Sequence, residues 1–154
     1  MNTNSTSDTA ILQPAASAFL PLDEKVSLAV IAIENAKNWQ DKYRQIMLVG
    51  KVLAPLAEAY KVEAAQVKGC ESQAWLYHHQ LESAHFFCAD SDSRIVKGLI
   101  AILLSATHGK TTSEIANFDL EQYFTQLGLS GQLSPSRTNG LTALANAIKQ
   151  FAAT

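Results

Sequence analysis

The sequence predicts an α+β domain in which a small antiparallel sheet packs against segregated helices. Two observations support this fold class. Residues 73–89 hold two alternating, aromatic-rich segments separated by a short turn, and the chain on both sides of them repeats apolar residues at helical spacing. With 154 residues, the chain has the size of one compact domain that buries its own core.

Composition divides the chain into a tail and a domain. Residues 1–21 are rich in Ser, Thr, Asn and Ala and carry almost no charge, which predicts a flexible N-terminal tail before a domain at residues 22–154. Apolar residues recur at three- and four-residue spacing from Asp23, and again over residues 38–53, so two helices are expected there. Pro55 ends the second helix, because proline cannot donate a helical backbone hydrogen bond.

The hairpin is the strongest strand signal in the sequence. Residues 73–81 alternate between an aromatic face and a second, mixed face. Residues 82–83 are expected to form the turn, and residues 84–89 return with aromatic strand formers.

A nearly all-apolar segment over residues 94–107 predicts a central buried helix. The short polar side chains of residues 90–93 are typical of a helix start, and His108 with Gly109 of a helix end. Gly98 lies inside this helix and costs about 1 kcal/mol of helix propensity. Its presence indicates that another backbone packs closely there.

Three further signals complete the domain. Thr111 and Glu114 fit the capping box of a short helix, and residues 120–127 predict another. Ser134–Pro135 opens the last helix, because proline is favoured in the first helical turn, and this helix is expected to end near Phe151.

Composition also excludes several classes of function. The net charge of -2 argues against a nucleic-acid binder, which needs a basic surface to contact phosphates. Two cysteines are too few for a disulfide framework or for an all-cysteine zinc or iron–sulfur site. The longest apolar run, residues 99–104, is far shorter than the ~20 residues of a membrane span. A signal or transit peptide requires basic residues near the N-terminus, and no Lys or Arg precedes Lys25. We therefore expect a cytoplasmic protein with free thiols.

The two cysteines differ in their surroundings. Cys70 follows Gly69, whose backbone freedom holds the thiol at a defined turn, so Cys70 is either a reactive thiol or a small buried apolar residue. Cys88 lies in the second predicted strand on the same face as Phe86, which favours a packing role.

Histidines near both cysteines raise the question of a metal site. His78, His79 and His85 lie between Cys70 and Cys88 in the chain. However, adjacent residues of a strand point to opposite faces, and the spacings match no zinc signature, so we expect no metal site. A nucleophile pair of Cys70 with His79 or His85 is geometrically possible across a small sheet, although no orienting group or oxyanion hole accompanies it.

Two charged residues are further candidates. Arg137 falls in the first turn of the last helix, where the macrodipole disfavours a cation. That position indicates a tertiary or functional partner, or else a solvated side chain. Asp92 lies among the short polar residues before the central helix, where a capping role is the simplest interpretation.

Four blocks of sequence resemble the SufE family of sulfur acceptors, which includes the CsdE branch. The blocks occur in the family's order and cover most of the chain after the tail. Four blocks at consistent spacing are far more specific than one short motif. They are Trp39–Arg44, Gly69–Trp75, Asp90–Leu99, and Leu133–Arg137 followed by Gly140–Leu141.

The resemblance implies a function. Members of the family accept sulfane sulfur from a pyridoxal-phosphate cysteine desulfurase of the SufS or CsdA type and pass it to iron–sulfur cluster assembly or another thio-cofactor pathway. By position, Cys70 would be the persulfide-forming residue, and Asp92 and Arg137 would lie in the active-site region or the docking surface. Pyridoxal phosphate would belong to the desulfurase, so the chain is expected to carry no cofactor of its own.

The resemblance also implies an accessory sulfur-transfer protein rather than a stand-alone enzyme. Its oligomeric state is left open between a monomer and a homodimer. The family fold is similar to that of the IscU-type cluster scaffolds but lacks their cluster-ligand cysteines. The alternative function is a metal or iron–sulfur scaffold of similar fold that uses Cys70, Cys88 and histidines. Cys88 stands where relatives often have glycine, which leaves a second redox role open.

Thiol chemistry defines the expected mechanism. The Cys70 thiolate would attack the outer sulfur of the desulfurase persulfide, at a rate set by its ionisation and access. Lys68 would favour the thiolate and Glu71 would oppose it. Gly69 makes the loop a hinge, so the thiol is expected to move from a sheltered position towards the partner.

Overall fold

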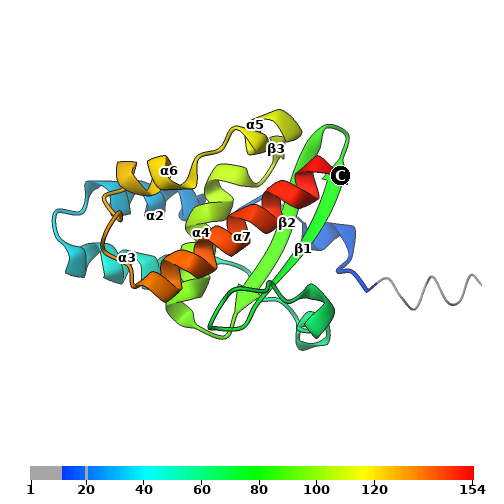
Figure 1. Cartoon of the computed structure of the whole chain (residues 1–154), viewed down its shortest axis with the longest axis horizontal. Coiled ribbons are helices and arrows are strands. Elements are labelled where there is room, and N and C mark those ends of the chain that lie inside the picture. The colour runs from blue at the N-terminus through cyan, green and yellow to red at the C-terminus, as the bar shows by residue number, and fades with distance from the viewer. Residues whose placement is uncertain (1–11, 20) are drawn as a thin grey trace, which may run out of the picture.

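The computed structural model describes residues 12–19 and 21–154 and confirms the α+β fold class (Figure 1). Across these two ranges, no helix is both long and apolar enough to cross a membrane. The α-helices are α2 (Glu24–Asn35), α3 (Trp39–Val52), α4 (Arg94–Thr107), α5 (Thr112–Ala116), α6 (Leu120–Gln126) and α7 (Pro135–Ala153). Short 3-10 turns form η1 (Ala16–Ala18), η2 (Glu58–Tyr60) and η3 (Glu63–Ala65). The strands are β1 (Ala74–Leu81), β2 (Ala84–Ser91) and β3 (Lys110–Thr111).

The strands form one antiparallel sheet in the order β1-β2-β3. The predicted hairpin is confirmed, since Leu81 pairs with Ala84 across the turn and Glu82 takes a left-handed backbone conformation with φ 55. Two features differ from the prediction. Strand β2 continues to Ser91 because its last residues still pair with β1, and β3 is too short to leave an alternating pattern.

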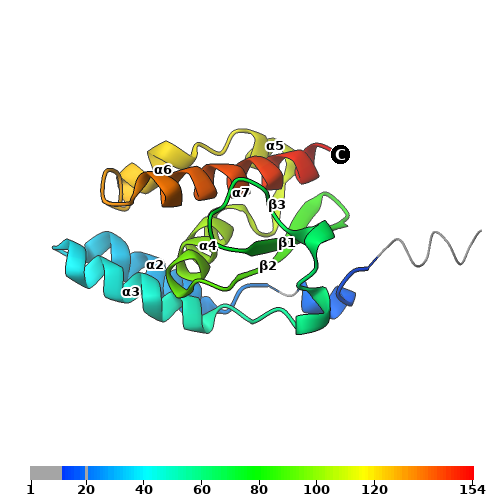
Figure 2. The ribbon, with the colours of Figure 1, turned by 60° about the horizontal axis from the view of Figure 1, so that its bottom comes forward.

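The two faces of the sheet are covered differently. On one face, Leu76 and Phe87 pack into the main core with residues of α4 and α7. On the other face, Trp75 and Tyr77 pack with Phe19 and with the segment around η2. Figure 2 shows α7 on one side of the sheet and the N-terminal segment (blue) on the other. Helices therefore cover one face, and irregular chain covers the second.

Helix α4 is the centre of the main core, as its apolar sequence predicts. Ser93 caps its start by accepting the Val96 N–H at 3.3 Å. The close approach predicted at Gly98 comes from α3, because a Cβ at this position would collide with the Ile46 carbonyl group. Gly50 of α3 lies opposite, where a Cβ would sit 3.0 Å from the Gly98 nitrogen. The two helices therefore cross at a pair of glycines.

The N-terminal segment joins the domain earlier than its composition suggests. Most of the predicted tail, residues 1–11 together with residue 20, lies outside the described residues. Within the remainder, Phe19 is only 5% exposed, and its ring centroid lies 5.3 Å from that of His79. Packing onto the sheet therefore begins before residue 22, since the Ala18 carbonyl also accepts a hydrogen bond from Cys88 of β2.

Candidate functional site

Cys70 lies in the loop between η3 and β1, where the chain rests on helix α7. The loop requires Gly69, whose φ of 95 falls in the left-handed region that side chains disfavour. A Cβ on Gly69 would come within 3.1 Å of the Ala143 side chain, so the contact with α7 is close. One helical turn earlier, the Cys70 S–H donates to the Gly140 carbonyl at 3.5 Å. Two small residues of α7 therefore hold the loop in place.

The thiol faces a pocket of about 330 Å³ between its loop, the start of α4 and the start of α7. The side chains that line this pocket are partly apolar and partly polar. Such a pocket can shelter a reactive sulfur atom while it offers polar groups to a partner. The apolar lining is Val96, Leu99, Leu141 and Leu144, and the polar side chains are Glu71, Ser72, Ser93, Ser134, Ser136 and Arg137.

Burial makes the Cys70 thiol a poor nucleophile while its loop rests on α7, a position that we call docked. Cys70 is half-buried against the main core, and this burial raises the pKa of its thiol above the ordinary value. Lys68 does not offset the effect at close range, because its ammonium group lies 3.8 Å from the Glu63 carboxylate and outside the pocket. In this conformation Cys70 is therefore held as the neutral thiol.

Arg137 lies in the same pocket as Cys70. The cap of α7 places it there, since the Ser134 hydroxyl accepts the Arg137 backbone N–H at 3.3 Å. Within residues 12–19 and 21–154, no carboxylate forms an ion pair with the guanidinium group. The cation is thus available to an anionic sulfur species or to an acidic group on a partner.

Asp92 lies outside this pocket. Its carboxylate accepts the Gln73 N–H at 3.0 Å, and its own N–H donates to the Gln73 carbonyl at 3.2 Å, so it fastens the start of β1 to the end of β2. The side chain faces a separate hollow, which Lys61 and Trp75 also line. The capping role expected for Asp92 is wrong, because Ser93 caps α4.

Cys88 lies on the opposite face of the sheet from the main core. Its S–H donates to the Ala18 carbonyl at 3.1 Å, and the residue packs against the cluster of Trp75 and Tyr77. Burial raises the pKa of this thiol to about 11. The structure does not bring Cys70 and Cys88 together, so the shared site that the scaffold alternative needs is not assembled.

Two of the three candidate histidines belong to a chain of hydrogen bonds. Thr112 donates to the Ala152 carbonyl at 3.1 Å, so its oxygen accepts from His85 Nε2 at 2.7 Å. His85 Nδ1 then accepts from His78 Nε2 at 2.8 Å. His79 points to the other face, towards Phe19, as the strand alternation predicts.

This chain of hydrogen bonds defines what the histidines do. Both ring nitrogens of His85 are occupied, so it is not placed to act as a base for Cys70. Burial lowers the pKa of both His78 and His85, and each ring therefore favours its neutral form. In the part of the chain that the structure describes, no three His, Cys, Asp or Glu side chains gather around a possible metal position.

Sequence reasoning missed a buried carboxylate in β2, opposite Trp75 of β1. Asp90 is 2% exposed and accepts the Leu56 N–H at 2.8 Å. Its oxygens also lie 3.7 Å and 3.5 Å from the ammonium groups of Lys61 and Lys97. Asp90 stands in a run of short polar residues that is typical of a helix start, so the sequence pattern does not indicate that it is a buried strand residue. Extending the strand alternation by two residues would have placed Asp90 opposite Trp75.

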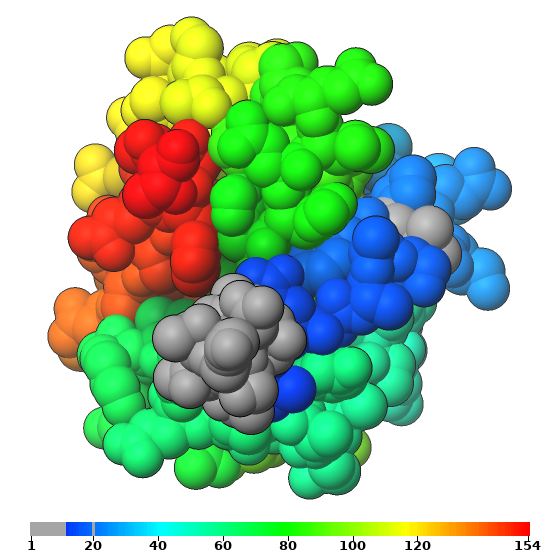
Figure 3. All heavy atoms as spheres, turned by 90° about the vertical axis from the view of Figure 1, so that its right-hand side faces the viewer, coloured from blue at the N-terminus to red at the C-terminus, as the bar shows by residue number. Residues whose placement is uncertain are grey.

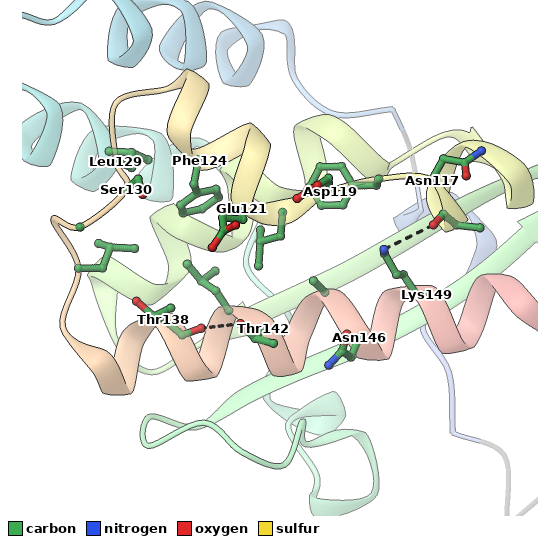
Figure 4. Close-up of a pocket in the computed structure, with 17 residues that line it drawn as sticks. Asn117, Asp119, Glu121, Phe124, Leu129, Ser130, Thr138, Thr142, Asn146 and Lys149 are labelled. Atoms are coloured by element: carbon green, nitrogen blue, oxygen red, sulfur yellow. Dashed lines mark hydrogen bonds between the residues drawn. The ribbon is translucent and has the colours of Figure 1, made fainter.

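A larger hollow of about 620 Å³ lies between α6 and α7 (Figure 4). Phe124 and Leu129 contribute apolar surface to it, and Lys149 closes one end by donating to the Ala116 carbonyl at 3.5 Å. The residues that line it include no cysteine or histidine. The candidate site is therefore the smaller pocket, because its lining includes the Cys70 thiol.

Comparison with known proteins identifies the class to which this fold and its cysteine loop belong. The family model described as "SufE: Fe-S metabolism associated domain" matches residues 29–152, and the chain belongs to this family. The sulfur acceptor protein CsdE of Escherichia coli (strain K12) is 46% identical over 113 residues, which cover 72% of this chain and 76% of that protein. An uncharacterized SufE-like protein of Rhizobium etli is 40% identical over 119 residues, which cover 75% of this chain and 80% of that protein.

A solved structure shares the fold. The solution structure of a hypothetical protein from Thermus thermophilus has a TM-score of 0.66 and 12% sequence identity, and the match covers 86% of this chain and 96% of that one. At this identity the likeness concerns the fold alone. The family resemblance of the four sequence blocks is confirmed by the family model and by the CsdE relative.

Proposed function

We propose that this chain is a sulfur acceptor that takes persulfide sulfur from a cysteine desulfurase of the SufS or CsdA type onto Cys70. The observation that carries the proposal is a sheltered thiol on a glycine-hinged loop beside Arg137, in a chain of the SufE family. The name of the Escherichia coli relative, a sulfur acceptor protein, supports it. The chain acts in the cytoplasm together with the desulfurase, which holds the pyridoxal phosphate.

The proposed transfer is an exchange between a thiolate and a persulfide. The Cys70 thiolate attacks the outer sulfur of the desulfurase persulfide, and a bond forms between that sulfur and Cys70 Sγ. The sulfur–sulfur bond of the donor breaks, and the desulfurase cysteine leaves as a thiolate. The Cys70 proton passes to solvent or to the desulfurase before the attack. No outside oxidant or reductant is consumed.

This reaction requires the loop to leave α7. The docked thiol is half-buried, and burial raises its pKa, so neither its protonation state nor its access suits the attack. Gly69 supplies the hinge, because glycine enters backbone regions that are closed to other residues. A released loop restores an ordinary thiol pKa and carries Sγ towards the donor.

Arg137 and Asp92 have different parts in the proposal. Arg137 lies in the pocket and stabilises the anionic sulfur that is formed on Cys70. Asp92 lies on the neighbouring surface and contributes to docking rather than to the chemistry. The sulfur on Cys70 then passes to iron–sulfur cluster assembly, for example to a cluster scaffold, or to another thio-cofactor pathway.

Mapping of persulfides by mass spectrometry tests this function. The purified chain is incubated with its cognate desulfurase and cysteine, and its peptides are analysed without reductant. We expect a mass gain of one sulfur atom on the peptide that contains Cys70. The gain should vanish in Cys70→Ser and persist in the matched control Cys88→Ser. An active desulfurase that leaves Cys70 unmodified would refute the proposed function.

A further inference from the structure

A further groove lies beside α7, at the outer side of the start of β1. Its volume is about 610 Å³, and it lies between α7 and residues 64–68, with Leu76 of β1 among its lining. Figure 3 shows this side of the molecule, where the C-terminal part of α7 (red) lies beside the hairpin (green). Small side chains form much of both walls, which leaves space between them. These small residues are Ala64, Ala65, Ala143 and Ala147.

Strand β1 is an edge strand, and part of its outer edge is open. The Val67 N–H donates to the Ala74 carbonyl at 2.8 Å, so the even-numbered residues of β1 direct their backbone groups away from β2. That contact covers the beginning of the edge. Further along, no described residue forms a hydrogen bond with the outward backbone groups of His78 and Gln80.

The groove and the open edge adjoin, because Phe151 lines the groove and its ring centroid lies 5.3 Å from that of His78. Together they suit an extended peptide. An exposed strand edge accepts an added strand through backbone hydrogen bonds, and pockets beside it select the alternate side chains. Lys68 is the one charged residue among those described that line the groove. The side chains that enter the groove are therefore expected to be uncharged, because a buried charge without a partner is costly.

The position of the groove identifies its occupant. Lys68 lines the end nearest the cysteine loop, and Gly69 rests on Ala143, which lines the groove as well. We propose that an extended, uncharged segment of the cysteine desulfurase binds along this groove as an added strand on β1. The inference rests on the proposed function, since the sulfur donor must approach the loop at the end of this groove. A strand bound there displaces the loop from Ala143 and so links docking to release of Cys70.

Two pairs of variants test the groove. Gln80→Pro removes an outward N–H that the added strand would use, and an edge strand tolerates proline at such a position. Gln80→Thr keeps the N–H and is its control. Ala147→Met fills the groove from α7, whereas Ala153→Met makes the same change on the same helix outside the groove. Circular dichroism and melting temperatures show whether each variant is folded.

Binding of each variant to the cognate desulfurase is measured by titration calorimetry. Because strand addition and groove filling both act on the same contact, we expect Gln80→Pro and Ala147→Met to weaken binding about tenfold, with each control within about twofold of the wild type. In the wild-type complex, hydrogen exchange should show new protection of the His78 and Gln80 amides. If Gln80→Pro fails to fold, Ala147→Met and this protection decide the matter.

The outcomes separate this inference from the proposed function. Equal affinities of Ala147→Met and Ala153→Met, without new protection at His78 and Gln80, would overturn the groove as the docking site. Protection that rises with the concentration of the chain alone would assign the edge to a second copy of this chain and would also overturn it. Persulfide formation on Cys70 is read separately. If Cys70 still forms a persulfide when either of these results is obtained, only the groove is refuted. If the wild-type chain forms no persulfide on Cys70, the proposed function is refuted.

Discussion

Cys70 and Cys88 are both half-buried, and each donates its S–H to a backbone carbonyl, at 3.5 Å to Gly140 and at 3.1 Å to Ala18. Their backbones differ. Cys70 follows a left-handed glycine in a loop, whereas Cys88 lies within β2 and pairs with Tyr77 of β1. A thiol in a paired strand moves only if ladder hydrogen bonds break, and a loop has no such restraint. Freedom of the backbone therefore distinguishes the candidate carrier from the packing residue.

Serine replacements should separate the two thiols most strongly. Cys70→Ser removes the nucleophile but keeps a small polar side chain in the loop, so stimulation of the desulfurase should fall to background while the melting temperature changes little. Cys88→Ser should retain most of the stimulation. The rate of alanine formation by the desulfurase, with and without each variant, provides the measurement. Equal losses in both variants would indicate a two-thiol mechanism.

Alkylation of the free protein gives the next largest contrast. Near pH ~8, a thiol with a pKa of about 11 is ionised to only about one part in a thousand, so Cys88 should react markedly more slowly than Cys70. The Cys70 rate should itself rise at higher pH than that of an unburied cysteine, because burial raises its pKa. Rates for a small and a bulky reagent, followed by peptide mass spectrometry, test both statements. A Cys70 that reacts with the bulky reagent like a fully exposed thiol would contradict the sheltered loop.

Arg137→Ala should lower sulfur acceptance about tenfold, because a charge-assisted contact to anionic sulfur is lost. The melting temperature should change little, since the guanidinium group has no ion-pair partner among the described residues. Arg137→Lys keeps the charge and should recover part of the activity. Single-turnover transfer rates provide the measurement, and transfer at the wild-type rate in the alanine variant would remove Arg137 from the site.

Gly69→Val should reduce sulfur acceptance several-fold, because a β-branched residue restricts the backbone dihedrals through which the hinge moves. Valine also disturbs the docked position, where it is strained at a φ of 95 and its Cβ would lie 3.1 Å from the Ala143 side chain. Gly131→Val is the matched control, because Gly131 is also left-handed, with a φ of 78, but its Cβ would meet no atom within 4 Å. Hydrogen exchange should show α4 intact in both variants.

In the wild type, exchange at residues 66–73 should change when desulfurase is added without cysteine, and an unchanged pattern would contradict the moving loop.

The histidine chain should give the smallest effect, a modest loss of stability in mild acid. Burial lowers the pKa of His78 and His85, so the unfolded chain takes up protons before the folded one does as the pH falls. The stabilising contribution is therefore complete above the unfolded pKa of ~6.5 and is lost as the pH falls towards the lowered folded values. Urea unfolding across this range measures the slope. His78→Gln removes one titrating ring and should flatten it, and a slope equal to the wild type would contradict the assignment.

Local patterns accounted for most of the fold. The hairpin, the apolar helix α4 and the capping box at Thr111 were all predictable, because alternation, helical periodicity and caps lie within short stretches of chain. Local patterns also misled at one boundary. The polar run before α4 was interpreted as a helix start, although Asp90 and Ser91 belong to β2. There the register with β1, which is a tertiary property, overrides the capping preference of short polar side chains.

The sequence by itself determined that a thiol stands after a glycine in a SufE-like block, and it placed the strands and helices around that block. Only the tertiary structure decided that Gly140 accepts the Cys70 hydrogen bond, that Arg137 shares the pocket, and that Cys88 lies on the far face. The partners of Lys42, in the Trp39–Arg44 block, were likewise decided by the tertiary structure. Its ammonium group donates to the carbonyls of Ile33 at 2.6 Å and Leu127 at 3.0 Å. Backbone carbonyls leave no signature in the sequence. Their positions depend on how helices far apart in the chain pack against one another.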